Sequence, residues 1–373
     1  MFKIVKKSKI SKARVGILKM KHGEIETPFF MSIATKGTVK SLTVDELKQI
    51  GVPIILSNTY HLMNRPGFEK IKKFGGVHKL IGWDGPILTD SGGYQIFSLS
   101  KLLKLNDRGV EFSPPNGGAS FNGKIFLFPE KTLEFQKEIG SDICMVLDEC
   151  PEYTKNKKRV KKAVNRTTYW AKRSNDLIEK WKGQKPLVFC IVQGGTFNDL
   201  RKKSLKELLK LEDPAKGGAS WDGIAIGGVS VGEPFSEAHK VLKFLSDKLP
   251  ENKPHYLMGV GYPEQIIQSV KQGIDMFDCV IPTRHARHGE LFVFKNGLNY
   301  ETIKIDKSKY STDFSSLDKK CSCYTCKNYS KAYLHHLYKS KELLYQRLAT
   351  IHNLKFYIDL MEKIRQGIKK NKI

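Results

Sequence analysis

Short apolar stretches recur along the chain, and segments with helical spacing separate them. Eight such stretches cover residues 27–35, 52–60, 85–93, 141–150, 186–195, 222–230, 254–261 and 273–282. Most are almost continuously apolar, which is typical of strands that are buried on both faces. Between them, segments such as 41–51, 129–140 and 262–273 repeat apolar residues with the period of a helix. Eight strands that alternate with helices predict an α/β fold, a (β/α)8 TIM barrel.

Seven of the eight stretches end in polar residues or glycine. In chain order these ends carry Asn58, Asp90, Asp148, Gln193, 227–228, 259–261 and Asp278. Asp, Asn and Gly also occur in ordinary turns, so one such end would indicate only a loop. Because the C-terminal ends of barrel strands surround the catalytic mouth, seven ends of the same character favour a site there.

The remaining segments divide the chain into three predicted parts. They are residues 1–282, a barrel with an N-terminal β-hairpin; 283–350, an inserted subdomain near the C-terminus; and 351–373, a C-terminal helix that packs back on the barrel. Within the hairpin we expect Gly16 and Gly23 at turns. Residues 97–125, rich in Gly, Pro and Asn, could form a lid over the mouth, and 211–223 is typical of a surface loop.

The charge of the chain is strongly positive. Lys and Arg outnumber Asp and Glu by 64 to 38, a net charge of +26. This balance suits a partner covered in phosphates, although a surface coated with lysine for other reasons would give the same sum. No apolar run approaches the ~18 residues of a membrane span, and the N-terminus lacks a signal-peptide pattern. We therefore expect a cytoplasmic protein that does not enter a membrane.

Three of the seven cysteines crowd into one short segment. Cys321, Cys323 and Cys326 lie within six residues, whereas the other four stand singly in apolar stretches. Three thiolates this close repel one another unless a cation neutralises them, and zinc fits thiolate and imidazole ligands best. The fourth ligand is one of three histidines: His335, His336 or His352. Because four protein ligands leave no position for water, we expect one structural zinc ion.

The predicted mouth is acidic. It offers Asp90, Asp148, Glu233 and Asp278, and the chain contains neither a Walker-type phosphate loop nor a Gly-x-Ser-x-Gly elbow. Paired carboxylates suit chemistry at the anomeric carbon of a sugar, where one attacks the carbon and the other transfers a proton. A glycoside hydrolase would satisfy this pattern as well.

An ordered set of motifs resembles bacterial tRNA-guanine transglycosylase, the queuine tRNA-ribosyltransferase family. The motifs are TDSGGYQ (89–95), DEC (148–150), VQGG (192–195), GGVSVGE (227–233), YLMGVG (256–261), FDCVIPTR (277–284) and CSCYTC with the later His352. They run in order from about residue 14 to 365. The resemblance implies a homodimer that binds the anticodon stem-loop of transfer RNA and exchanges the wobble guanine, position 34, of GUN anticodons (Asp, Asn, His, Tyr). The incoming base would be 7-aminomethyl-7-deazaguanine (preQ1), a step in queuosine biosynthesis that passes through a covalent enzyme–RNA intermediate.

The resemblance also assigns roles to individual residues. Asp278 would be the nucleophile and Asp90 the general acid/base. The residues implied to bind the base are Ser91, Gly92, Gly93, Tyr94, Asp148, Cys150, Gln193, Gly228, Val229, Val231 and Met258. Those implied to bind RNA are Gly259, Val260, Gly261, Tyr262, Pro263, Glu264, Gln265, Thr283, Arg284, His285, Ala286 and Arg287. The metal ligands would be Cys321, Cys323, Cys326 and His352.

Several positions bear on alternatives. Val231 and Cys150 follow the bacterial pattern, which favours preQ1, but Ser230 departs from it, so queuine remains a second candidate for the incoming base. His285 and His288 stand where small or amide residues are usual. A non-catalytic relative would have lost Asp90 or Asp278, and a glycoside hydrolase would not need a purine clamp. The stripe Tyr333, Leu334, Leu337 and Tyr338 either covers the barrel or forms a two-fold interface.

Overall fold

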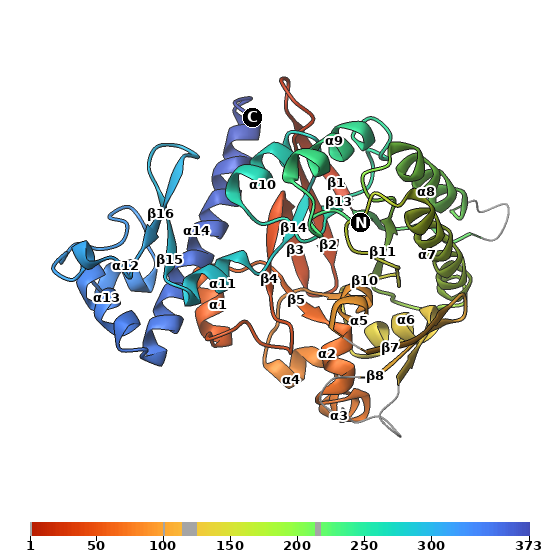
Figure 1. The fold of residues 1–373 in the computed structure, drawn as a ribbon, viewed down its shortest axis with the longest axis horizontal. Coiled ribbons are helices and arrows are strands. Elements are labelled where there is room, and N and C mark those ends of the chain that lie inside the picture. The colour runs from red at the N-terminus through yellow and green to blue at the C-terminus, as the bar shows by residue number, and fades with distance from the viewer. Residues whose placement is uncertain (1, 100, 114–124, 213–217) are drawn as a thin grey trace.

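A closed parallel barrel forms the centre of the computed structural model, which describes residues 2–99, 101–113, 125–212 and 218–373 (Figure 1). Its strands are β4 (Phe29–Ile33), β5 (Ile55–Asn58), β6 (Ile87–Asp90), β10 (Ile143–Met145), β11 (Leu187–Val192), β12 (Gly223–Ile226), β13 (His255–Leu257) and β14 (Met276–Asp278). The last strand closes on the first, with Phe277 opposite Phe30. All eight strands fall within the eight apolar stretches, so the predicted TIM barrel is confirmed.

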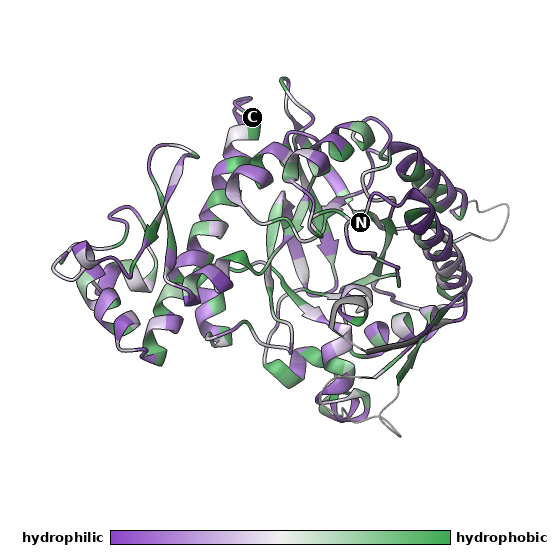
Figure 2. Ribbon diagram, viewed as in Figure 1, coloured by the Kyte–Doolittle hydropathy of each residue, from purple (hydrophilic) through white to green (hydrophobic). Residues whose placement is uncertain are grey.

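Helices surround the barrel. They are α1 (Val44–Ile50), α2 (Thr59–Asn64), α3 (Phe68–Phe74), α4 (Val77–Ile81), α5 (Gly93–Leu99), α6 (Pro129–Glu138), α7 (Lys157–Ile178), α8 (Asn198–Lys210), α9 (Phe235–Leu245), α10 (Pro263–Val270) and α11 (Ile281–Arg287). In α7, Asn156 caps the first turn and buried residues such as Val160, Val164 and Ala171 recur at helical spacing, so one face packs on the barrel. The outer faces of α7 and α8 are hydrophilic (Figure 2).

Two small antiparallel sheets flank the barrel. The first contains β1 (Phe2–Lys7), β2 (Arg14–Met20) and β3 (Gly23–Thr27), one strand more than the expected hairpin. Gly16 lies inside β2 rather than at a turn, where it pairs with Ile4 and Thr27. A side chain would not fit at this position, because a Cβ would come within 2.4 Å of the Phe2 ring. The second contains β7 (Lys101–Asn106), β8 (Gly109–Ser113) and β9 (Ile125–Leu127). The lid over residues 97–125 stays a prediction, since 100 and 114–124 lie outside the described residues, as do 213–217 of the expected loop 211–223.

The C-terminal region is built on one long helix. It contains β15 (Glu290–Phe294), β16 (Tyr300–Lys304), the 3-10 helix η3 (Ser308–Tyr310), α12 (Tyr324–Asn328), α13 (Lys331–Lys339) and α14 (Leu343–Lys369). Figure 1 shows α14 between the barrel and the part that holds α12 and α13. It begins at Leu343, earlier than the expected 351, because 343–350 continue the same helical pattern. The division of the chain at 283 and 351 stays a prediction.

Side chains of α14 tie this region to the barrel. The Asn353 amide donates to the Pro282 carbonyl at 3.0 Å and accepts from the Phe292 amide at 3.1 Å. The Tyr357 hydroxyl donates to the Gly261 carbonyl at 2.6 Å. On α13, Leu334 and Leu337 of the predicted apolar stripe are buried, whereas Tyr333 is exposed. In the described part of the chain no helix is long and apolar enough to cross a membrane.

Buried ionic clusters hold the floor of the barrel, opposite the mouth. Asp142 accepts from the His22 and Ile87 backbone amides at 3.0 and 2.9 Å, and the His22 and His78 rings stack beside it at 3.8 Å. Although His22, His78 and Asp142 lie close enough to bind a metal ion, the two amides already satisfy the carboxylate. We interpret this cluster as structural. Near the N-terminal sheet, the buried Arg14 pairs with Asp275 at 2.6 Å.

Candidate active site and metal cluster

Two carboxylates stand at the mouth, at the C-terminal ends of β6 and β14. Asp90 accepts hydrogen bonds from the Asn58 side chain at 2.5 Å and from the amides of Thr59 and Gly92 at 3.1 and 3.0 Å. Asp278 accepts from the Tyr256 hydroxyl at 2.6 Å and from the Gly259 amide at 2.9 Å. Most of these donors come from the ends of neighbouring strands, so the barrel itself fixes the direction of both carboxylates.

The two carboxylates differ in their surroundings. Burial raises the pKa of Asp90 to about 7, and the charge of Asp278 contributes to the same rise. Burial also raises the pKa of Asp278, against which the Tyr256 and Gly259 hydrogen bonds act by favouring its anion. A carboxyl that titrates near neutral pH suits proton transfer, and a carboxylate with oriented donors suits attack on an electrophile.

A buried polar clamp lies between β6, β10 and β11. Asp148 accepts from the Gln193 side chain at 2.7 Å and from the Ser91 hydroxyl at 3.2 Å. Burial raises the pKa of Asp148 to about 6. The Gln193 side-chain oxygen is buried and has no hydrogen-bond partner among the described residues. An unpaired buried acceptor beside an acidic carboxyl can receive a ligand with N–H groups, such as the polar edge of a purine.

Two glycines make room for this clamp. A Cβ on Gly93 would approach the Asp148 carbonyl oxygen to 2.6 Å, and one on Gly228 would approach the Gln193 side-chain oxygen to 2.2 Å. Gly228 also has φ 61°, a backbone conformation that favours glycine. Both glycines belong to the predicted site, and the structure brings them to Asp148 and Gln193.

The other predicted base-binding residues differ in how far they are buried. Cys150 and Val229 are buried, whereas Val231 and Met258 are partly buried and Tyr94 is 52% exposed. A sandwich of the base between Tyr94 and Met258 stays a prediction. Glu233, assigned only to the acidic mouth by sequence, accepts from the Val231 amide at 3.0 Å and also from the Ser230 amide. It thereby shapes the loop beside the clamp.

The predicted RNA-binding residues lie on α10, α11 and the loop before α10. Arg284 is exposed, but Thr283 and Ala286 are buried, so they hold α11 rather than face solvent. The His285 Nδ1 lies beside the Glu290 carboxylate. Tyr262 lies edge-on to the His285 ring at 5.8 Å. A cavity of about 230 Å³ separates the two loops of the mouth and is lined by Ser230, Glu233, Gly259, Gly261, Tyr262 and Gln265 among others.

Sequence reasoning missed Arg201, a fully buried residue of α8. Its guanidinium donates to four backbone carbonyls, those of Val192, Gly195, Gly227 and Gly228. The signal was an arginine between Leu200 and Leu205 on the apolar face of a helix. Tyr256, which bonds to Asp278, was missed as well, and Asn58 was placed at the mouth without its role as the partner of Asp90.

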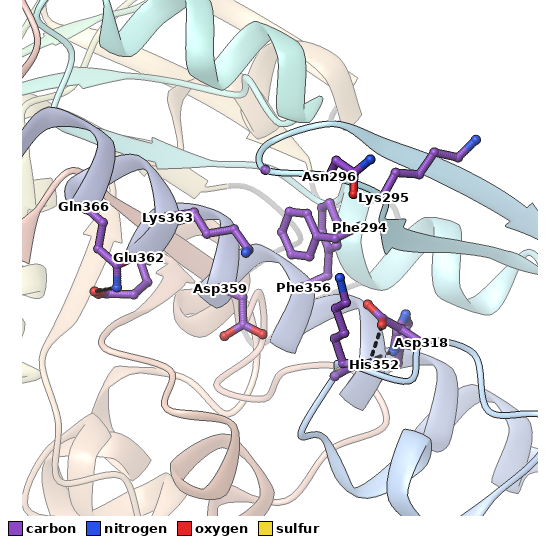
Figure 3. Close-up of a pocket in the computed structure, with 13 residues that line it drawn as sticks. Phe294, Lys295, Asn296, Asp318, His352, Phe356, Asp359, Glu362, Lys363 and Gln366 are labelled. Atoms are coloured by element: carbon purple, nitrogen blue, oxygen red, sulfur yellow. Dashed lines mark hydrogen bonds between the residues drawn. The ribbon is translucent and has the colours of Figure 1, made fainter. Parts of the chain in front are cut away.

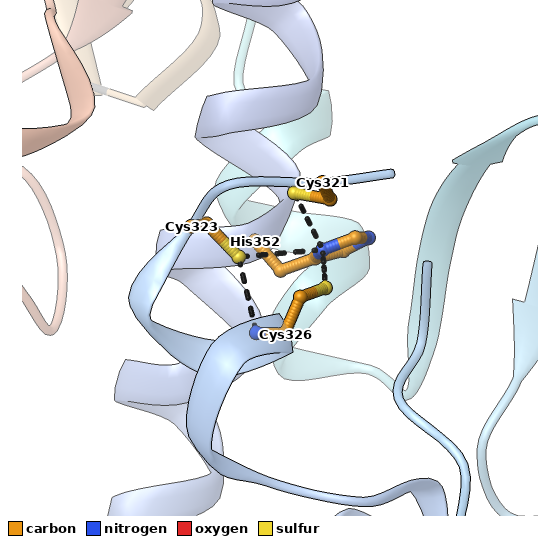
Figure 4. A group of neighbouring side chains, drawn as sticks. All are labelled: Cys321, Cys323, Cys326 and His352. Atoms are coloured by element: carbon orange, nitrogen blue, oxygen red, sulfur yellow. Dashed lines mark hydrogen bonds between the residues drawn. The ribbon is translucent and has the colours of Figure 1, made fainter. Parts of the chain in front are cut away.

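Three cysteines and one histidine converge beside α14 (Figure 4). The His352 Nδ1 lies 3.2, 3.7 and 3.9 Å from the Sγ atoms of Cys326, Cys323 and Cys321. His352 Nε2 bonds to the Phe292 carbonyl at 2.8 Å, an outer contact typical of metal-bound histidine. His335 instead bonds to the Ile305 carbonyl at 2.7 Å. The four converging ligand atoms could hold a metal ion.

A cavity of about 330 Å³ opens beside this cluster (Figure 3). Its wall includes Cys321 and His352, the stacked rings of Phe294 and Phe356, and charged side chains of both signs such as Asp359 and Lys363. The carboxylates and the polar clamp of the mouth are not among the residues that line it. The cavity therefore belongs to the surroundings of the metal cluster.

Comparison with known proteins agrees with this geometry. A family model described as Queuine tRNA-ribosyltransferase matches residues 8–373. The Queuine tRNA-ribosyltransferase of Caldanaerobacter subterraneus is 49% identical over 372 residues, which covers 100% of this chain and 94% of that protein. The protein of the same name from Thermodesulfovibrio yellowstonii is 50% identical over 367 residues, 98% and 91% of the two chains. That of Vibrio campbellii is 48% identical over 363 residues, 97% and 91%.

Proposed function

Because the chain belongs to the queuine tRNA-ribosyltransferase family, we propose that it replaces the wobble guanine of GUN-anticodon transfer RNAs with preQ1. Members of this family are tRNA-guanine transglycosylases, a class of pentosyltransferase, and the chain is such an enzyme. The proposal adds the position, the anticodons and the incoming base. The observation that carries it is the polar clamp of Asp148 and Gln193 beside the two carboxylates of the mouth.

The two carboxylates divide the reaction into two displacements. A carboxylate oxygen of Asp278 bonds to the anomeric carbon of the target nucleotide as the bond from that carbon to guanine breaks. Guanine leaves with the electron pair and takes a proton from Asp90. The incoming base then gives a proton to Asp90 and attacks the same carbon, which releases Asp278. The pKa of about 7 at Asp90 supports both directions of proton transfer near neutral pH.

The clamp matches the edge of a guanine-like base. Asp148, when ionised, accepts from the amino and imino N–H groups, while the Gly228 N–H and the side-chain N–H of Gln193 that does not bond to Asp148 donate to the carbonyl of the base. A polar edge left without partners in this buried place would cost several kcal/mol, so the base that fits must carry complementary groups. Val231 and Cys150 limit the space beyond the ring, which favours preQ1, and the Val229 carbonyl is a candidate acceptor for its aminomethyl group.

Queuine is the second candidate for the incoming base. The reason is Ser230, which departs from the bacterial pattern beside Val231; in the structure it is exposed and its amide donates to Glu233. Rates of incorporation of both bases into the same transfer RNA distinguish the two. Faster incorporation of queuine would contradict the argument from Val231.

We assign one structural zinc ion to the cluster of Cys321, Cys323, Cys326 and His352. Three soft sulfur ligands and one imidazole nitrogen fit zinc, and a complete protein ligand set leaves no open position for catalysis. The ion would hold α12 to α14. Metal analysis that finds no stoichiometric zinc in the purified protein would contradict this assignment.

The RNA and a second subunit are assigned to different surfaces. Arg284 and Arg287 on α11 follow Asp278 in the chain and are suited to the phosphates and bases that flank the target nucleotide.

Exposed apolar side chains gather at α12 and α13, where Tyr333 and Phe314 line one shallow hollow and Phe314 is 81% exposed. Such a patch is typical of a protein interface, which supports a homodimer. The cytoplasmic location stays a prediction.

The covalent intermediate provides the direct test. An anticodon stem-loop with guanine at the wobble position is mixed with the protein and run on a denaturing gel. We expect a shifted band with the native chain, no band with Asp278→Asn, and no band when the wobble base is adenine. An adduct that persists in Asp278→Asn would place the nucleophile elsewhere.

A further inference from the structure

The loop that faces the carbonyl edge of the base is built from residues with little intrinsic rigidity. Gly227 and Gly228 cannot carry side chains, since a Cβ on either would come within 2.7 Å or less of the Gln193 side chain. Two glycines in sequence leave their peptide groups free to rotate. For the pocket to present an N–H rather than a carbonyl at this edge, another residue must fix the orientation of these peptide groups.

Arg201 provides that constraint. From α8 its guanidinium donates to the Gly227 carbonyl at 2.6 Å and to the Gly228 carbonyl at 3.1 Å. It also donates to the carbonyls of Val192 and Gly195, on either side of Gln193, at 2.7 and 2.8 Å. One rigid, planar group therefore holds four carbonyls from the strand ends that carry the clamp.

The direction of these bonds sets the direction of the amides. In a planar trans peptide the carbonyl and the following N–H point in opposite directions. Because Arg201 holds the Gly227 carbonyl, the Gly228 N–H must point away from Arg201. It points toward Cys150, whose thiol pKa it lowers, although burial, the larger effect, raises that pKa to about 12. Cys150 belongs to the predicted base pocket, so the amide faces the base.

The electrostatic arrangement is unusual for a buried arginine. Arg201 is fully buried, and among the described residues no carboxylate forms an ion pair with it, although the charge of Glu233 acts on it from farther away. Burial lowers its pKa only to about 10, so it stays charged at neutral pH. Arg14 at the barrel floor, by contrast, has Asp275 as a counter-ion. A buried cation whose described hydrogen bonds all go to backbone carbonyls is costly for stability, and such a cost points to a role at the pocket.

We propose that Arg201 is a positioning residue that fixes the Gly228 amide as a donor and thereby makes the pocket select a purine with a carbonyl, not an amino group or a hydrogen, at that edge. The inference rests on the proposed function, because it assumes that a guanine-like base binds between Asp148 and Gly228. Asp148 reads the amino edge independently of Arg201, so the two edges can be tested separately.

The test compares three bases as competitors of labelled guanine in the exchange reaction. Guanine carries both groups, 2-aminopurine lacks the carbonyl and with it the imino N–H, and hypoxanthine lacks the amino group. For Arg201→Met we expect the preference for guanine over 2-aminopurine to fall about tenfold or more, while the preference over hypoxanthine stays within about twofold. Arg201→Lys, which keeps the charge but not the planar fork, should recover only part of the lost preference.

Arg14→Met is the matched control. It removes a buried arginine that also donates to two backbone carbonyls, those of Glu251 and Lys253, but at the opposite end of the barrel. It should lower the melting temperature and leave both preferences unchanged. The inference is overturned if a folded Arg201→Met keeps the native preference for guanine over 2-aminopurine, or if both preferences fall together. If the native chain binds none of the three bases, the proposed function itself fails.

Discussion

Asp148→Asn should make the protein more stable and less able to bind a base. Asp148 is 5% exposed, and burial raises its pKa from 3.8 to about 6. Ionisation of this carboxyl is therefore harder in the folded chain than in the unfolded chain. The folded state binds more protons between these two pH values, so the stability of the native protein falls as the pH rises from 3.8 to 6 and stays lower above it.

The size of the effect follows from the interval between the two values. One pH unit corresponds to about 1.4 kcal/mol, so keeping Asp148 ionised at pH 8 costs roughly 3 kcal/mol of unfolding free energy, and at pH 5 about half of that. The substitution removes the charge but keeps a side chain that can bond to Ser91 and Gln193. We expect the unfolding free energy of the variant to exceed that of the native chain by up to about 3 kcal/mol at pH 8, and by less at pH 5.

Urea unfolding at the two pH values, followed by the fluorescence of the buried Trp170 and Trp221, measures this difference. Asp176→Asn on the exposed face of α7 is the control and should change stability by less than about 0.5 kcal/mol at both pH values. At pH 8, where Asp148 is ionised, guanine affinity of Asp148→Asn should fall about 100-fold or more, because two hydrogen bonds to a charged acceptor are lost. A variant that is less stable at pH 8, or whose advantage does not depend on pH, would refute the reasoning.

The carboxylate pair, the metal cluster and the exposed aromatic patch each give a further prediction. Asp278→Asn removes the charge that helps to raise the pKa of Asp90, so that pKa should fall below about 7 in a carboxyl NMR titration; an unchanged value would show that the two groups do not interact. Cys326→Ser should lose the metal ion and lower the melting temperature by more than about 10 °C, measured by elemental analysis and calorimetry, and full metal content would contradict the ligand set. Tyr333→Lys should convert the expected dimer to a monomer in light scattering, whereas Phe74→Lys, which changes an exposed aromatic on α3, should not; a dimer in both variants would move the interface.

The sequence predicts the barrel because its strands carry an unambiguous pattern. Strands buried on both faces must be almost continuously apolar, as in 187–192, and a polar residue at the end, such as Asp278, is then conspicuous. The extra strand at the N-terminus was missed because β1 alternates between half-buried and exposed residues and has many lysines. β1 is a strand because it pairs with β2, and a pattern of neighbouring residues does not reveal such a pairing.

The site could be predicted where chemistry alone marks a residue. Spacing indicated the cysteines, but it left three histidines open as the fourth ligand, and only the packing of α14 places His352 beside the thiols. The role of Arg201 could not be predicted, because a single arginine in a lysine-rich amphipathic helix gives no sign that it points inward. Its role depends on carbonyls from residues before it and after it in the chain, which the fold alone brings together.

The pairing of β14 with β4 has a consequence for how the protein is made. Asp278 lies opposite Met31, so the backbone contacts that close the barrel are the same ones that place the proposed nucleophile. During translation β4 cannot pair with β14 until β14 has left the ribosome, and some 250 residues separate the two strands in the chain. A chain that has not yet reached residue 278 has an open sheet and lacks the proposed nucleophile. The closed barrel and the proposed nucleophile therefore arise together, from the same strand pairing.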